Sequence, residues 1–345
     1  MPSCPTRSAD TLAVYPSTTV SLSAFGKTVI IGLMQRQVGS VGMIEAEKLT
    51  KKFQDFTAVD SLSLSVPPGQ VLALLGPNGA GKTTTVRMLS AILTPTSGRV
   101  TVAGFDAIQF PQEVRRRVGM LTELPGLYLR MQAMEYLDFF GQLYGLSASQ
   151  RLARSAALLS RFGMADAVDK RLSEYSKGMR QKLALIRSML HNPSVLLLDE
   201  PTSAMDPQSA RLVRDAIADL RGEQHAIILC THNLVEAEEL ADRIAIIRRG
   251  KIIIEGTAAA LKSELLGPPL MELTLNAPLD GLLPDLQQRV QVVEQGDVWV
   301  RYQTENPAVE NPRLLRWLTE AGVEVVTLGQ VTRSLEDVYL HVVAE

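Results

Sequence analysis

The sequence lacks the features that define several large classes of protein. It has two cysteines, Cys4 and Cys230, which are too few for a disulfide framework and indicate a reducing compartment. No apolar run approaches the roughly 20 residues that cross a bilayer, and no apolar stretch of secretory type opens the chain. We therefore expect a chain that is neither exported nor membrane-spanning.

A large excess of charge of one sign is also lacking. The 35 Lys and Arg residues nearly balance the 37 Asp and Glu residues, so the formal net charge is −2. A near-neutral chain does not bind polyanions through bulk electrostatics, so we expect no nucleic-acid partner and a local site for any bound phosphate. The length of 345 residues, with 46% hydrophobic residues, is sufficient for about two folded domains.

The pattern of the sequence divides the chain into three parts. Residues 1–42 are rich in small and hydroxylated residues without a usable period, so we interpret them as a disordered tail, or Met43 as the native start. Residues 43–264 alternate apolar runs with helical stretches, which predicts an α/β domain with a mostly parallel sheet. Its expected strands include 71–75, 195–198, 226–230 and 244–247, and its expected helices include 81–93, 209–220 and 234–241.

Two further segments have patterns of their own. Residues 125–175 show only helical periodicity, which predicts a helical lobe inserted into the α/β domain. Residues 265–345 follow a Gly-Pro-Pro segment and predict a small α+β domain at the C-terminus. The expected helices of the lobe are 133–143 and 149–162, and the last domain is expected to contain strands 271–275, 290–294, 298–302 and 323–328 and a helix over 312–321.

A glycine-rich segment between the strand at 71–75 and a helix fits the phosphate-binding pattern Gly-x-x-x-x-Gly-Lys-Ser/Thr. Its glycines permit backbone angles that turn successive N–H groups into one concavity, to which the helix adds its positive end. Lys82 can reach the β and γ phosphates, and Thr83 can place its hydroxyl on Mg²⁺. A plain glycine-rich turn is the alternative. The predicted phosphate-binding residues are Gly76, Pro77, Asn78, Gly79, Ala80, Gly81, Lys82, Thr83 and Thr84.

Two carboxylates follow the apolar run at 195–198. At the carboxyl end of a parallel strand, side chains face the crevice in which ligands bind. Asp199 would hold Mg²⁺ through water, and Glu200 would act as general base for the water that attacks the γ-phosphate. The alternative is that Asp-Glu-Pro only begins a loop.

Residues 43 to about 261 resemble the ATP-binding subunit of an ABC transporter. The matching motifs, in the family's order, are 76–84, 175–181, 197–206 and Thr231-His232. The segment 175–181, Tyr-Ser-Lys-Gly-Met-Arg-Gln, resembles the ABC signature, usually Leu-Ser-Gly-Gly-Gln, which other P-loop enzymes lack. Lys177 and Met179 replace the usual Gly and Gln, so the usual Gln contact is missing here while a positive charge is added.

The resemblance implies an ATP sandwich built by two chains. In that arrangement Ser176 and Gly178 of one subunit close over the γ-phosphate held by Lys82 of the other, and His232 senses that phosphate. A helix that begins at Ser176 also favours an anion at its N-terminus. An ordinary Ser cap and a structural histidine are the alternatives.

The resemblance also assigns the remaining contacts. Phe53 stands twenty-nine residues before Lys82, at the family's position for the aromatic ring that stacks on adenine, with Phe56 as a rival. Glu123 occupies the position of the family's Q-loop glutamine, where its carboxylate can bind Mg²⁺ or water. Around residues 124–131 the chain should meet a membrane partner.

The function implied is hydrolysis of ATP, with Mg²⁺, to drive an integral membrane permease on a separate chain. A second copy of this subunit would complete a homodimer, peripheral on the cytoplasmic face of the plasma membrane. The ending 334–340 resembles the ATPase subunits of exporters. The alternative is a soluble ABC ATPase acting on ribosomes or DNA, but one P-loop and no sustained heptads disfavour it. The signature and His232 disfavour a P-loop kinase or GTPase.

Overall fold

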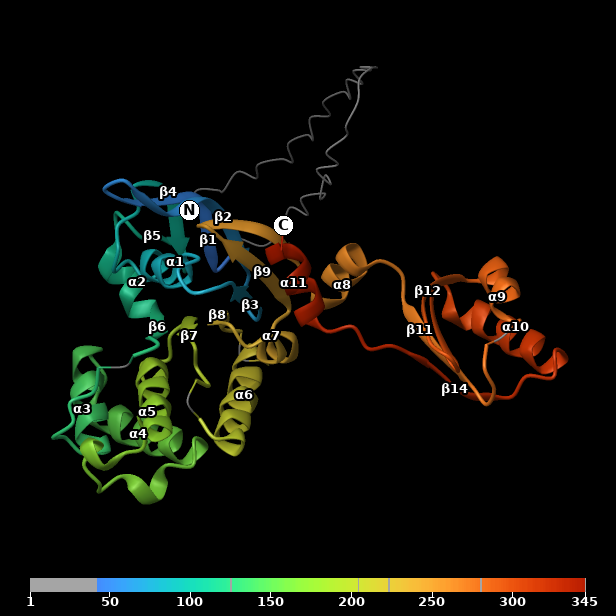
Figure 1. Ribbon diagram of the computed structural model, residues 1–345. Helices are drawn as coiled ribbons and strands as arrows, with labels where there is room; N and C mark the ends of the chain where they lie inside the picture. The colour runs from blue at the N-terminus through green and yellow to red at the C-terminus, as the bar shows by residue number, and fades with distance from the viewer. Residues whose placement is uncertain (1–41, 125, 204, 223, 280, 345) are drawn as a thin grey trace, which may run out of the picture. The chain divides into compact units, whose positions relative to one another are not determined.

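The computed structural model describes residues 42–344, apart from residues 125, 204, 223 and 280. They fall within one unit of the chain, and Figure 1 shows their helices and strands coloured in chain order from blue to red. The prediction of a tail or a later start falls almost entirely on residues 1–41, which lie outside the described part of the chain. Within that part, no helix combines the length and the apolar character that crossing a bilayer requires.

A mostly parallel sheet in the order β10-β9-β3-β8-β7-β6 forms the centre of the fold, with β10 antiparallel at one edge. Every residue of β3, β7 and β8 is buried, which is why these strands are continuous apolar runs in the sequence. The predicted α/β fold is therefore confirmed. The strands are β3 (Val71–Leu75), β6 (Val118–Leu121), β7 (Val195–Asp199), β8 (Ala226–Thr231), β9 (Arg243–Arg248) and β10 (Lys251–Gly256).

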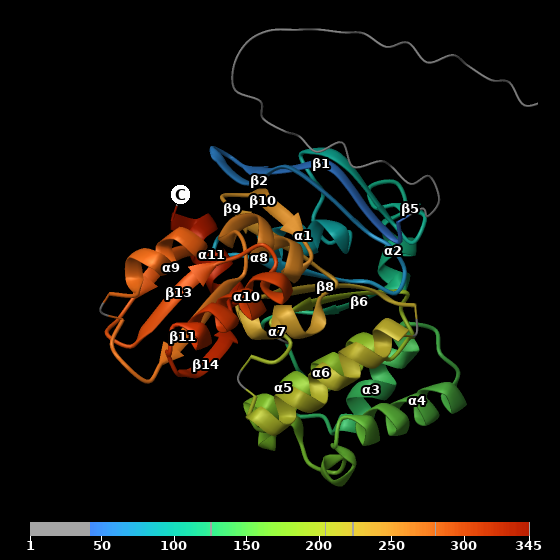
Figure 2. The same cartoon turned by 90° about the vertical axis from the view of Figure 1, so that its right-hand side faces the viewer.

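Helices that precede or follow these strands in the chain cover the sheet (Figure 2). The helices predicted over 209–220 and 234–241 are observed within two residues of those limits, whereas the helix predicted to reach residue 93 ends at Leu89. Ala91 has a left-handed backbone angle of φ 54, which a continuing helix does not permit. These helices are α1 (Lys82–Leu89), α2 (Pro111–Arg117), α6 (Pro207–Gly222), α7 (Leu234–Leu240) and α8 (Ala258–Leu266).

A second, antiparallel sheet in the order β2-β1-β4-β5 packs over α1. Of its strands, the sequence predicted only the one that opens near Met43. The inward residues of these strands, such as Ile44, Leu62 and Val100, share a core with Val86 of α1. The strands are β1 (Ile44–Phe53), β2 (Phe56–Val66), β4 (Ser97–Val102) and β5 (Phe105–Asp106).

The helical lobe lies between β6 and β7, as predicted. Capping boxes at Gln132 and Ser147 satisfy backbone N–H groups at the start of two of its helices. Tyr136, Leu159 and Phe162 are buried in its core together with residues of α5. Its main helices are α3 (Ala133–Leu143), α4 (Ala148–Arg161) and α5 (Lys177–Met189), with short 3₁₀ turns at Ala165–Ala167 and Leu172–Glu174.

The C-terminal part contains its own sheet, in the order β12-β13-β11-β14, which confirms the predicted α+β character. Two helices bury Leu286, Leu314 and Leu318 against one face of this sheet. The helix α10 begins at Pro307, earlier than predicted, and continues through Pro312 without that residue's backbone N–H. The elements are β11 (Leu270–Leu275), α9 (Leu283–Arg289), β12 (Gln291–Gln295), β13 (Trp299–Gln303), α10 (Pro307–Glu320) and β14 (Val325–Gln330).

The last helix, α11 (Leu335–Ala344), packs against the central sheet and α8, and not against the small sheet. Leu335 and Val338 are buried in a cluster with Leu75 of β3, Ile246 of β9 and Leu261 of α8. The predicted domain boundary between residues 264 and 265 remains a prediction for the segment that carries β11–β14. The predicted C-terminal domain also included α11, but the structure places this helix in the core of the central sheet.

Because Leu335 is fully enclosed by that cluster, we expect Leu335→Ala to lower the free energy of unfolding by about 2–5 kcal/mol. Leu340→Ala, on the same helix but 58% exposed, should change it by less than about 0.5 kcal/mol. Urea denaturation of the full chain measures both. Equal effects of the two substitutions would contradict the packing of α11 described above.

Candidate functional site

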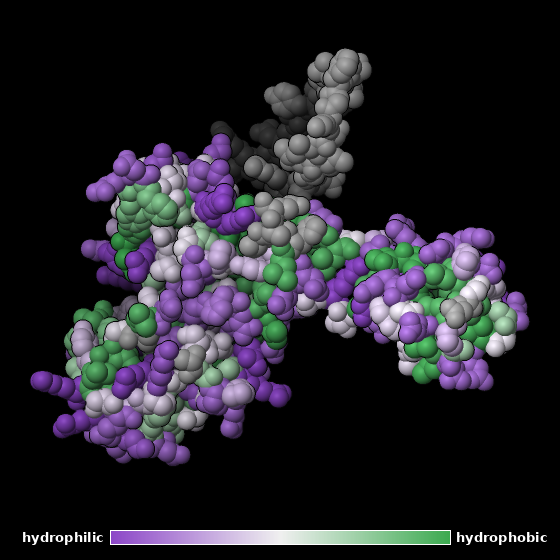
Figure 3. All heavy atoms as spheres, in the orientation of Figure 1, coloured by the Kyte–Doolittle hydropathy of each residue, from purple (hydrophilic) through white to green (hydrophobic). Residues whose placement is uncertain are grey.

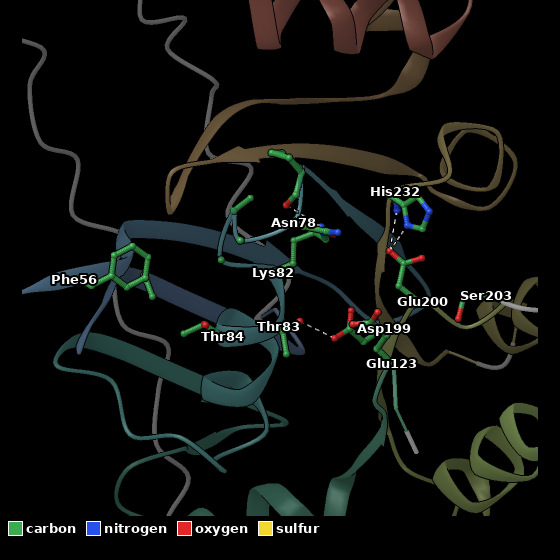
Figure 4. A pocket seen from close by; sticks show the side chains of 15 residues that line it. Phe56, Asn78, Lys82, Thr83, Thr84, Glu123, Asp199, Glu200, Ser203 and His232 are labelled. Carbon is green, nitrogen blue, oxygen red and sulfur yellow. Dashed lines mark hydrogen bonds and ion pairs between the residues drawn. The ribbon is translucent and has the colours of Figure 1, made fainter. Parts of the chain in front are cut away.

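A cavity of about 390 Å³ lies at the carboxyl ends of the parallel strands (Figure 4). The loops after β3, β6, β7 and β8 all open into it, as is general for parallel α/β sheets. This arrangement brings most of the predicted site residues together. The residues that line the cavity are Phe56, Ala58, Pro77, Asn78, Gly79, Ala80, Gly81, Lys82, Thr83, Thr84, Glu123, Asp199, Glu200, Ser203 and His232.

The glycine-rich loop requires glycine at two positions for different reasons. Gly81 caps α1 with a left-handed backbone angle of φ +111, and a Cβ there would lie 2.7 Å from the carbonyl oxygen of Ala58. Gly76 has ordinary angles, but its Cβ would meet the carbonyl oxygen of Ile247 at 2.3 Å. The loop can therefore pass close to the neighbouring backbone and expose its N–H groups to the cavity.

Lys82 is buried in this loop, with 7% of its surface exposed. Its Nζ donates hydrogen bonds to the carbonyl oxygens of Gly76 at 2.6 Å and Pro77 at 3.2 Å. Lys82 is also the first residue of α1, whose positive end faces the cavity. The ammonium group and the helix end together favour a bound anion.

The hydroxyl of Thr83 donates a 2.8 Å hydrogen bond to Oδ2 of Asp199, which is 2% exposed. Burial raises the pKa of Asp199, the negative charges of Glu200 and Glu123 raise it further, and the bond from Thr83 opposes this shift. A hydroxyl and a carboxylate are hard oxygen ligands that suit Mg²⁺. Among the described residues no three His, Cys, Asp or Glu side chains form a group that could hold a metal ion.

Glu200 is held in a left-handed conformation, with φ 52, that is uncommon outside glycine. Its backbone N–H donates to the carbonyl oxygen of Cys230 at 2.8 Å, and Nε2 of Gln181 donates to its carbonyl oxygen at 3.1 Å. Its Oε1 accepts a 3.0 Å bond from the backbone N–H of His232 and lies 2.7 Å from Nδ1 of that ring (Figure 4). The predicted base and the predicted switch histidine therefore form one pair.

Four predicted binding residues do not line the cavity of this single chain, namely Phe53, Gly76, Ser176 and Gly178. Phe53 lies at the end of β1, where the Lys51 ammonium sits 5.1 Å from its ring centroid, whereas Phe56 does line the cavity. Ser176 and Gly178 lie at the start of α5, where the exposed Ser176 accepts a 3.2 Å bond from the backbone N–H of Met179. The roles of Phe53 and of the signature residues remain predictions.

Sequence reasoning gave no role to three residues that the structure places in or beside the site. Ser203 lines the cavity, and its place within the 197–206 motif was the available signal. Ala58 also lines it, but nothing distinguishes this alanine in the sequence. Glu236 is buried behind Glu200 and His232, four residues after the histidine.

Because burial raises the folded-state pKa of Asp199, its ionised form at neutral pH weakens the fold, and protonation at low pH relieves this. We expect Asp199→Asn, which can still accept from Thr83, to raise the unfolding midpoint of the nucleotide-free chain by about 2–4 °C at pH 7.5. The difference should shrink as the pH is lowered. Scanning calorimetry of both chains measures it, and a lower midpoint for the variant at pH 7.5 would contradict this description.

Known proteins resemble this chain in sequence and fold. The family model described as "ABC transporter" matches residues 59–203. The ABC transporter ATP-binding protein NatA of Bacillus subtilis is 41% identical over 224 residues, which cover 64% of this chain and 91% of NatA. The daunorubicin resistance ATP-binding protein DrrA3 of Streptomyces coeruleorubidus is 36% identical over 312 residues, 88% of this chain and 96% of that protein.

A solved structure, described as the dimeric post-hydrolysis state of an ATP-binding cassette bound to ADP and Pi, has the same fold. Its TM-score is 0.58 at 21% identity, and the match covers 62% of this chain and 98% of that chain. NatA and DrrA3 are matched over nearly their full lengths at well above 30% identity. This chain therefore belongs to the ATP-binding subunits of ABC transporters, a family of ATPases.

Proposed function

We propose that this chain hydrolyses ATP in the cavity at the ends of β3, β6, β7 and β8, and so drives an exporting permease. The observation that carries the proposal is that one cavity joins a buried ammonium, a hydroxyl–carboxylate pair and a carboxylate–histidine pair. These are the groups that phosphoryl transfer to water needs for binding, charge neutralisation and proton removal.

Each of these side chains then has a defined role in the hydrolysis of ATP. Nζ of Lys82 and the loop N–H groups bind the β and γ phosphates. Thr83 and Asp199 would hold Mg²⁺, with Glu123 beside them, and the ion would neutralise phosphate charge when bound. Glu200 accepts a proton from the water whose oxygen bonds to the γ-phosphorus, as the bond from that phosphorus to the ADP oxygen breaks. His232 holds Oε1 of Glu200 in place.

The active form would be a homodimer in which a second copy covers the nucleotide. Ser176 and Gly178 lie outside the cavity of their own chain, and the first turn of α5 presents N–H groups that suit an anion. The related cassette, which is described as dimeric and bound to ADP and Pi, supports a dimer. In the dimer, Lys177 would add positive charge near the γ-phosphate held by the partner.

The permease would contact the helical lobe. Hydrophobic surface gathers over the part of the molecule that contains α3 (Figure 3). Leu143 of α3 and two residues that precede this helix, Leu124 and Tyr128, are 68%, 81% and 52% exposed, and exposed apolar side chains that gather on one surface are typical of an interaction site. Such a contact would hold the chain on the cytoplasmic face of the plasma membrane. The drug-resistance role in the name of DrrA3 favours export, and the relatives do not favour a ribosome- or DNA-directed ATPase.

The assignment of Glu200 predicts a kinetic effect without a binding effect. Glu200→Gln keeps the size of the side chain but removes the base, so single-turnover hydrolysis should slow by about 10²–10⁴, or roughly 3–5 kcal/mol of barrier. Affinity for ATP, measured by equilibrium titration, should be retained.

Lys82→Ala provides the contrasting variant, because it should weaken the binding of ATP itself. An unchanged hydrolysis rate in Glu200→Gln would remove that residue from the role of base, and full ATP affinity in Lys82→Ala would refute the phosphate assignment.

The shared site predicts that the signature controls dimerisation by ATP. On the Glu200→Gln background, which traps ATP, Gly178→Asp should weaken ATP-dependent dimerisation at least about tenfold, because a carboxylate then faces the γ-phosphate. An acidic residue suits the first turn of a helix, so α5 should remain folded. Gly178→Ala is the neutral control, and sedimentation with and without ATP measures both. Equal dimerisation of the two variants would argue against the shared site.

A further inference from the structure

A buried carboxylate behind the cavity joins the two segments that carry Glu200 and His232. Glu236 lies in α7 and is 1% exposed. Its Oε1 accepts a 2.8 Å hydrogen bond from the hydroxyl of Thr202, and its Oε2 accepts a 2.7 Å bond from the hydroxyl of Thr231. Thr202 follows Glu200 by two residues and Thr231 directly precedes His232, so one carboxylate connects both segments.

Nothing in the packing of α7 requires a charged side chain at this position. Ala237 and Leu240 of the same helix are buried as apolar residues, and an apolar residue at position 236 would avoid the cost of burying a carboxylate. Burial raises the pKa of Glu236 and so does the charge of Glu200, while the bonds from Thr231 and Thr202 and the charge of Arg214 lower it. The two hydroxyl donors are what make the buried carboxylate tolerable.

The hydrogen bonds also restrict the orientation of both segments. The backbone N–H of Asn233 donates to the hydroxyl oxygen of Thr231 at 3.0 Å, so that hydroxyl is fixed from both sides. On the other segment, Glu200 holds an uncommon backbone conformation that its surroundings must maintain. A small rotation of either segment would change the 2.7 Å contact between Oε1 of Glu200 and Nδ1 of His232.

We infer that Glu236 is a positioning residue for ATP hydrolysis, which fixes Glu200 and His232 relative to each other through Thr202 and Thr231. It lines no part of the cavity, so it would act on a bound nucleotide only through other residues. The inference rests on the proposed roles of Glu200 and His232. Displacements of about 1 Å in a catalytic group can cost about a hundredfold in rate, so the effect falls on turnover and not on ATP binding.

The experiment compares variants of the full chain in single-turnover hydrolysis of ATP and in binding of a non-hydrolysable ATP analogue. Glu236→Ala removes both acceptors and should slow hydrolysis about 10–100-fold, with unchanged affinity and one analogue bound per chain. Glu236→Gln retains an acceptor oxygen and the size of the side chain, and should restore hydrolysis to within about threefold of the wild type. Glu239→Ala is the matched control, because this glutamate lies on the same helix but is half exposed.

A purely structural role would give different results. If Glu236 only stabilised the fold, Glu236→Ala would lower the amount of analogue bound per chain and would slow hydrolysis further on the Glu200→Gln background. A residue that acts through Glu200 should add no further loss there. If Glu236→Ala does not fold, Thr202→Val removes one of the two bonds with little change in shape and should slow hydrolysis at least threefold with binding retained.

Two outcomes overturn the inference. The first is wild-type hydrolysis by Glu236→Ala, or by Thr202→Val where the alanine variant does not fold, and the second is loss of analogue binding in step with loss of hydrolysis. Failure of the proposed function is recognised separately, because the wild type would then not hydrolyse ATP or Glu200→Gln would be as active as the wild type.

Discussion

Repulsion between negative charges is the constraint on which this site depends. Asp199, Glu200 and Glu123 line the same cavity as Lys82, and a triphosphate would bring further negative charge into it. Burial raises the pKa of Asp199, and the negative charges of Glu200 and Glu123 raise it further. The N–H groups of the glycine-rich loop, the N-terminus of α1 and the buried ammonium of Lys82 all offset that charge. The hydroxyl of Thr83 and the carboxylate of Asp199 are hard oxygen ligands that suit a divalent cation.

This constraint also explains why the site is assembled from rigid elements. Each reacting group follows a strand that is buried along its whole length, so its position is set by the central sheet and not by a mobile loop. The unusual conformation of Glu200 is held by a hydrogen bond that its backbone N–H donates to Cys230 and by one that its carbonyl oxygen accepts from Gln181. Local strain is tolerated there because the surrounding core determines the backbone path.

Much of this arrangement could be predicted because it depends on local sequence. Apolar runs that end in Gly76, Asp199 and Thr231 indicated buried parallel strands, and parallel strands place their carboxyl ends together. The position of the adenine ring could not be predicted in the same way. Phe53 and Phe56 pair across the turn between β1 and β2, so their relation to the cavity depends on how that hairpin packs and not on spacing.

The contacts of Glu236 were beyond prediction for a related reason. Its partner Thr202 lies thirty-four residues earlier in the chain, and only the adjacency of β7 and β8 brings the two together. The early end of α1 at Leu89 and the early start of α10 at Pro307 depend on local backbone choices that periodicity does not record.

The path of the chain after α8 determines which truncations and deletions would leave the core of the central sheet intact. Residues 267–334 leave the ATPase core as a loop carrying their own sheet, and α11 then returns to bury Leu335 and Val338 beside β3 and β9. A stop codon placed before the small sheet would strip the closing helix and uncover apolar core. Excision of the sheet would need a short bridge between residues 266 and 335, and exchange with the corresponding segment of a relative would need two junctions.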